Sequence, residues 1–73
     1  MSDHDFTRAL VKDARKEAKR LGATIPKGLH AHRVTSGGNP WYEVRDWSGA
    51  LVWQGSASDA YEARANAISE VCQ

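Results

Sequence analysis

The segment from Trp41 to Gly55 constrains the fold most, because it has the pattern of a β-hairpin. Apolar and polar residues alternate in both of its runs, and the side predicted to face inward consists of Tyr42, Val44, Leu51 and Trp53. Between the runs, Asp46 can bond its own backbone and Gly49 can adopt positive φ, as a hairpin turn requires. A sheet with one apolar side is covered on that side only, so the hairpin predicts helices on one face.

Residues 6–22 have the period of an amphipathic helix that ends at Gly22. Its apolar side comprises Phe6, Leu10, Ala14 and Leu21, with Val11 and Ala18 at the edge. Its opposite side is a basic face made of Arg8, Lys12, Arg15, Lys16, Lys19 and Arg20. Residues 1–5 are expected to be a flexible N-terminus, with Ser2 or Asp5 as the cap of the helix.

Two further segments complete the predicted fold. Residues 29–35 alternate as a strand with His30, His32 and Val34 on one side, and the pattern leaves open which side faces inward. Residues 36–40 form a turn, and after the hairpin Ser56 or Ser58 is expected to cap a final helix. The apolar side of that helix comprises Ala60, Tyr61, Ala65, Ile68, Val71 and Cys72. The predicted fold is therefore α+β in the order α-β-β-β-α, a three-stranded antiparallel meander with two helices packed on one face, in a single domain of residues 6–73.

The composition argues against several classes of protein. The single cysteine excludes an internal disulfide, and His30 and His32 lack a third ligand for a metal, so no metal and no cofactor are predicted. No nucleophile has an activating base in the pattern, so we expect no enzyme. No apolar run approaches the ~20 residues of a membrane helix, and the N-terminus is unlike a signal peptide. We expect a cytoplasmic monomer without membrane contact, in the cytoplasm of the host bacterium if the chain is phage-encoded.

The net charge of +1 hides an uneven distribution. Residues 1–33 carry eight Lys or Arg and four Asp or Glu, whereas residues 34–73 carry two and five. The basic face could follow the phosphates of a nucleic acid, with salt-sensitive binding. It could equally be a solubilising helix surface, partly neutralised by Asp13 and Glu17.

Three tryptophans are more than a core of this size can bury. Exposed tryptophan and arginine are enriched where proteins bind proteins, and aromatic rings also stack on bases. The predicted partner-binding surface is the open side of the sheet with its loops, and its residues are Trp41, Arg45, Trp47, Arg33 and His32. The alternative is that Trp41 and Trp47 cap the two ends of a small core.

The order of elements resembles the double-stranded RNA-binding domain. The run that carries this resemblance leads from Trp41 through Trp53 and Gly55 into Ser58, Ala63, Arg64, Asn66 and Ala67. That family places consecutive lysines at the start of its last helix to hold phosphates, where this chain has Asp59, Tyr61 and Glu62. The resemblance therefore implies the fold and argues against the family's activity. The hairpin and final helix are also similar to the arm-type DNA-binding module of phage integrases, which uses its sheet face on DNA.

In length and character the chain also resembles small transcription inhibitors and antiterminators of Xanthomonas phage. The shared character is a cysteine-poor single domain rich in Ala, Arg and Gly. The resemblance implies a non-catalytic protein that binds the large subunit of host RNA polymerase, inhibits initiation and suppresses termination. The alternatives are a nucleic-acid-binding module that uses the basic helix and sheet face, and an anti-CRISPR or anti-restriction inhibitor.

Overall fold

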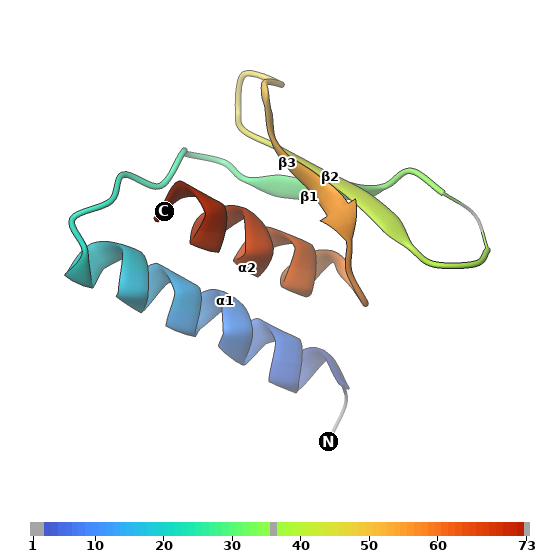
Figure 1. Ribbon diagram of the computed structural model, residues 1–73, viewed down its shortest axis with the longest axis horizontal. Helices are drawn as coiled ribbons and strands as arrows, with labels where there is room; N and C mark the ends of the chain where they lie inside the picture. Colours follow the sequence, from blue (N-terminus) through green and yellow to red (C-terminus); the bar gives the residue numbers. More distant parts are fainter. Residues whose placement is uncertain (1–2, 36, 73) are drawn as a thin grey trace.

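The computed structural model describes residues 3–35 and 37–72. Its elements are α1 (Asp3–Arg20), β1 (His30–Arg33), β2 (Trp41–Arg45), β3 (Leu51–Ser56) and α2 (Ala60–Val71). The strands form one antiparallel sheet in the order β1-β2-β3, and both helices lie on one side of it (Figure 1). The predicted α-β-β-β-α fold with helices on one face is confirmed. No helix in the described part of the chain is long and apolar enough to cross a membrane.

The helix α2 occupies the middle of the molecule. It contacts all three strands and also α1, whereas the contacts of α1 with other elements are contacts with α2. The two helices run side by side in the same direction (Figure 1), and near their N-terminal ends Thr7 Oγ1 donates to Asp59 Oδ2 over 2.7 Å. The sheet, α2 and α1 are therefore stacked in that order.

Two sides of α2 are apolar, which explains its central position. Ala60, Ala63 and Ala67 pack with Tyr42 and Val44 of the sheet. A different side, formed by residues spaced four and three apart, carries Tyr61, Ala65 and Ile68. The guanidinium of Arg8 on α1 lies 5.7 Å from the centre of the Tyr61 ring, so this second side faces α1. Alanine side chains allow both neighbours to approach closely.

The core is thin. In the part of the chain that the structure describes, five of the eight buried apolar residues are alanines, and the largest fully buried side chains are Ile68 and Val44. Stability scales with the apolar area removed from water, so these two side chains contribute a large share of it.

Packing on α2 leaves much of the predicted apolar side of α1 exposed. Phe6 and Leu21 are 70% and 51% exposed, so the prediction that they face a core was wrong. The neighbour of α1 is the helix α2, which covers a narrower stripe of α1 than a sheet would. The buried residues of α1 in that stripe include Thr7 and Ala18. The helix begins at Asp3, so Asp5 lies within it, whereas residues 1–2, including the predicted cap Ser2, lie outside the described residues.

A β-bulge changes the predicted hairpin. Val44 pairs with Trp53, but the next residue of β2, Arg45, pairs with Leu51, so Val52 is an extra residue in β3. Leu51 consequently shares the side of Arg45 and is 44% exposed, and its predicted inward position was wrong. Val52 packs against the core in its place.

The cap of α2 also differs from the prediction. Asp59 is the N-cap residue, and its Oδ1 accepts from the backbone N–H of Glu62 over 2.8 Å. The Glu62 carboxylate in turn accepts from the backbone N–H and the hydroxyl of Ser58, at 3.1 and 3.2 Å. This reciprocal arrangement is a capping box, in which Asp59 rather than Ser56 or Ser58 caps the helix.

Candidate functional site

The side of the sheet away from α2, called here the open sheet face, carries the main candidate site. Leu29 and Ala31 pack against the core, which places His30 and His32 on this face and resolves the orientation of the first strand. Cross-strand partners share a face, so three rows run across it. These rows are His30, Arg45 and Leu51; His32, Glu43 and Gln54; and Val34, Trp41 and Ser56.

Apolar area is concentrated on the open sheet face and its turn. Six large apolar side chains are exposed in the described part of the chain, and four of them, Val34, Trp41, Trp47 and Leu51, belong to this region. The other two are Phe6 on α1 and Leu21 just after it. Exposed apolar groups that gather on one face indicate an interaction surface.

The polar side chains of the open sheet face are held by bonds within the chain. The Arg45 guanidinium donates to Glu43 Oε1 over 3.1 Å and to the carbonyl oxygen of Gly49 over 2.9 Å. The rings of His30 and His32 meet edge to face, with centres 4.8 Å apart. These contacts fix both a cationic and an anionic group next to the exposed apolar side chains.

Trp47 projects from a rigid turn at one end of this face. The Asp46 Oδ1 atom accepts from the Ser48 N–H over 2.9 Å, the Ser48 hydroxyl over 2.7 Å and the Ala50 N–H over 3.1 Å. The N–H of Trp47 donates to the carbonyl oxygen of Lys27 over 3.0 Å. The backbone is therefore held from two directions while the tryptophan residue is 76% exposed.

Gly28 allows the turn to approach the segment before β1. Its φ is +66°, and a Cβ atom there would lie 2.9 Å from the Cβ of Trp47. A side chain at this position would be strained and would also push the turn away. The position of Trp47 thus depends on a glycine distant in sequence.

The structure brings together most of the predicted partner-binding residues. Trp41, Arg45 and His32 share the open sheet face, and Trp47 lies beyond its Arg45 end. Arg33 instead pairs with Tyr42, which places it on the other side of β1, and its Nε donates to the carbonyl oxygen of Thr35 over 2.9 Å. Trp41 and Trp47 lie at opposite ends of β2, so they form two separate anchors.

Six residues of the open sheet face were not among the predicted binding residues: His30, Val34, Glu43, Leu51, Gln54 and Ser56. Val34 lies two residues after His32, so alternation along the strand places it on the same side as His30 and His32 and could have identified it. Gln54 follows the inward residue Trp53, so alternation likewise places Gln54 on the open side. For Leu51 the alternation pointed to the wrong side, because nothing in the pattern marks the bulge.

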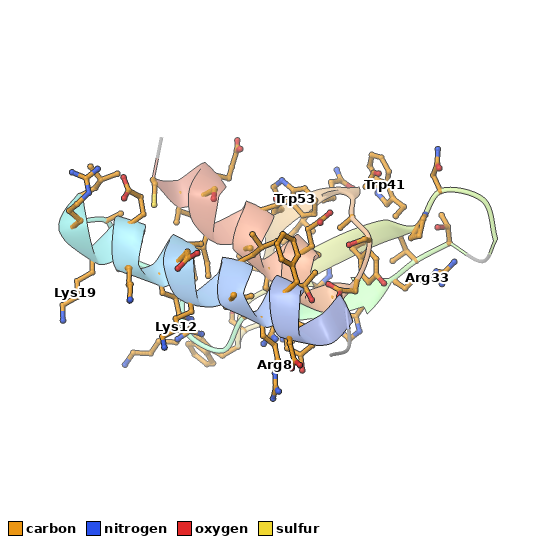
Figure 2. All side chains as sticks on the ribbon, turned by 90° about the horizontal axis from the view of Figure 1, so that it is seen from below. Arg8, Lys12, Lys19, Arg33, Trp41 and Trp53 are labelled. Carbon is orange, nitrogen blue, oxygen red and sulfur yellow. The ribbon has the colours of Figure 1, made fainter. Side chains whose placement is uncertain are left out.

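The basic face lies on a different side of the molecule. Arg8, Lys12 and Lys19 project together from one side of α1, opposite the side on which Trp41 and Trp53 lie (Figure 2). All six predicted basic residues are exposed. Arg20 forms an ion pair with Glu17, and its hydrogen bond lowers the pKa of that carboxyl below the ordinary value. Arg20 is thus partly neutralised, unlike the row formed by the other basic residues.

Tyr61 joins the basic face to α2. Two guanidinium groups lie over its ring, those of Arg8 at 5.7 Å and Arg64 at 4.9 Å from the ring centre. Within the described residues, the buried Nε of Arg64 has no hydrogen-bond partner. Arg64 thus places a guanidinium group of α2 over the same ring as Arg8 of α1.

Within residues 3–35 and 37–72 there is no pocket, and no three His, Cys, Asp or Glu side chains are grouped to hold a metal ion. No protein-family model, curated protein or solved structure matches the chain.

Replacing Asp46 with asparagine should lower the melting temperature near neutral pH and have little effect in strong acid. The hydrogen bond from the Ser48 hydroxyl is the main reason that the pKa of Asp46 lies below its ordinary value, and backbone N–H groups add to it. Because the folded-state pKa is lowered, the carboxylate stabilises the fold above the ordinary value of about 4, and this stabilisation is lost as pH falls through the lowered value. Thermal melts of both proteins at neutral pH and in strong acid test this, and an equal difference in both conditions would contradict it.

Proposed function

We propose that the chain is a small non-catalytic regulator that binds a partner protein through the open sheet face and the Trp47 turn. The observation that supports this most directly is the exposed Trp47 on a turn fixed by Asp46 and Lys27. A tryptophan on a rigid backbone buries a large area on binding and loses little conformational entropy. Such residues often carry most of the energy of an interface.

The rest of the surface has the composition of an interface around this anchor. Leu51 and Trp41 supply further exposed apolar area, and arginine, the residue type of Arg45, is enriched at binding hot spots, as tryptophan is. Glu43 and His32 provide polar groups between the two apolar ends. Because both signs of charge are present, the surface suits a partner that also carries both.

The partner we propose is bacterial RNA polymerase, with inhibition of initiation and antitermination as the results of binding. The support for this partner is the resemblance in length and character to small regulators of Xanthomonas phage. A nuclease target, as for an anti-CRISPR or anti-restriction inhibitor, would use the same surface.

A second candidate function is nucleic-acid binding through the basic face. With about 100° between successive residues of a helix, the side chains at positions 8, 12, 15 and 19 fall within about 60° around α1. These positions hold Arg8, Lys12, Arg15 and Lys19, and Figure 2 shows three of them on one side. A row of this kind can follow phosphates, and each contact steepens the dependence of binding on salt.

Amide NMR titrations of the labelled protein separate the two functions. With purified RNA polymerase, we expect signals from residues 41–56 to shift or broaden while those from residues 8–19 do not, and run-off transcription to fall as terminator readthrough rises. With short DNA or RNA duplexes at moderate salt, we expect no change. Changes confined to residues 8–19, and only with nucleic acid, would overturn the first function in favour of the second.

A further inference from the structure

The strand β3 is an open edge of the sheet. It is the last strand in the order β1-β2-β3, and the elements it contacts are β2 and α2. Figure 1 shows it in front of the other two strands, with nothing drawn over it. With six residues, it is the longest strand, and it contains neither a proline nor a charged residue. The other edge, β1, has four residues and carries Arg33 with two histidines.

This contrast matters because proteins usually protect an open edge with charge, proline or a very short strand. The edge formed by β1 is short and charged, whereas β3 has neither charge nor proline along Leu51–Ser56. The one protecting feature of β3 is the bulge at Val52, which lies at the Leu51 end and leaves the pairing of Trp53–Ser56 regular. This uncharged, regular stretch is a template for another strand.

The hydrogen bonds identify which backbone groups of β3 are available. Ala57 N–H donates to the carbonyl oxygen of Pro40, and hydrogen-bonded pairs alternate with non-bonded pairs in an antiparallel ladder. The pairs Trp41–Ser56 and Glu43–Gln54 are therefore of the non-bonded kind. Gln54 and Ser56 consequently point their N–H and C=O groups away from β2.

Three observations favour a second copy of the same chain as the occupant of this edge. The accessible surface of 4958 Å² exceeds the roughly 4,450 Å² expected for a compact monomer of this mass. The molecule measures 37 × 32 × 19 Å, and Figure 1, viewed along the shortest axis, shows the strands one behind another. Pairing at β3 would extend this thinnest dimension. An uncharged strand also meets its own copy without repulsion.

We propose that two copies pair β3 with β3 in antiparallel fashion, about a two-fold axis next to Gln54, to give a six-stranded sheet. Antiparallel pairing is self-complementary: Gln54 meets Gln54 of the other copy, and Ser56 meets Val52. This dimer replaces the monomer expected from the sequence. It joins two open sheet faces into one surface with two Trp47 anchors, so a partner would be bound at two points. The proposal does not depend on the identity of that partner.

Molar mass measured by sedimentation equilibrium from micromolar to millimolar concentration tests the dimer. We expect the wild-type mass to approach twice the 8.0 kDa of one chain. Gln54→Pro removes an outward N–H and should abolish the dimer, since an edge strand tolerates proline where its N–H is free. Arg33→Pro is the matched control, because Arg33 has the equivalent outward position on β1 and its change should leave the dimer intact.

A second variant and a second measurement guard against a proline variant that fails to fold. Gln54→Lys puts an ammonium opposite Glu43 within each chain but brings two like charges together across the axis, so it should also give a monomer. In the wild type, hydrogen exchange at the amides of Gln54 and Ser56 should slow with rising concentration, while that at Arg33 should not. A single-chain mass at millimolar concentration, a dimer that survives both Gln54 variants, or concentration-independent exchange at Gln54 would each overturn the proposal.

Discussion

Replacing Ile68 with alanine should destabilise this protein by about 3 kcal/mol, within the range of about 2–5 kcal/mol for such changes in cores. Among the described residues, Ile68 and Val44 are the largest fully buried side chains, and the side of α2 that carries Ile68 faces α1. Neighbouring alanines are too small to fill the space that the substitution would leave. The total free energy of unfolding of a chain of this size is only roughly 4–11 kcal/mol, and the thin core places this chain near the lower limit. Thermal and urea unfolding monitored by circular dichroism would show a melting temperature lower by on the order of 15 °C.

Leu21→Ala is the control for this substitution. Leu21 is also a four-carbon aliphatic side chain, but it is 51% exposed. The Leu21→Ala substitution should lower the free energy of unfolding by less than about 1 kcal/mol, because less apolar area returns to water and no cavity forms. If Leu21→Ala were as damaging as Ile68→Ala, the assignment of Ile68 to the core between the helices would be wrong.

Replacing Trp47 with alanine should weaken binding of the partner protein by roughly 30-fold or more, which corresponds to about 2 kcal/mol. The substitution keeps the Cβ atom that lies near Gly28 and the N–H that donates to Lys27, so the turn should keep its conformation. The indole ring is lost, and with it the largest exposed apolar group of the surface. Affinity for RNA polymerase measured by biolayer interferometry, with a melting curve for each variant, tests this expectation.

Phe6→Ala is the matched control for Trp47. Phe6 is an aromatic residue exposed to a similar degree, but it lies on α1, away from the open sheet face. Its loss should leave both affinity and melting temperature nearly unchanged. Equal affinity of Trp47→Ala and the wild type would remove Trp47 from the proposed interface, and a loss only with Phe6→Ala would move that interface to α1.

The sequence pattern was sufficient for the order of the elements and for the inward residues of β2. Alternation identified Tyr42 and Val44 as inward residues, since a period of two assigns faces within one strand. It failed at Leu51, because the bulge at Val52 interrupts the alternation within β3: Val52 and its neighbour Trp53 both pack against the core. A helical period likewise identified an apolar side of α1 but not the width of the surface that would cover it.

The candidate site was predictable to a similar extent. Trp41 and Arg45 share a face, as their parity within one strand indicated, whereas parity left the face of His32 open. The support of Trp47 could not be predicted, because it depends on Lys27 and Gly28, about twenty residues earlier in the chain. The side of β1 that faces inward required the packing of Leu29 and Ala31 against α2 and the sheet.

The stacking of sheet, α2 and α1 also makes the outer helix part of the core. The helix α1 is bound to the remaining elements through α2 alone, but that interface buries Ile68 of α2 and Ala18 of α1. Separating α1 would therefore return one of the two largest fully buried side chains to water, at a corresponding cost in free energy. The two surfaces thus belong to opposite ends of one stack: the Trp47 anchor is attached to the sheet, and the basic face belongs to the helix that closes the core from the other side.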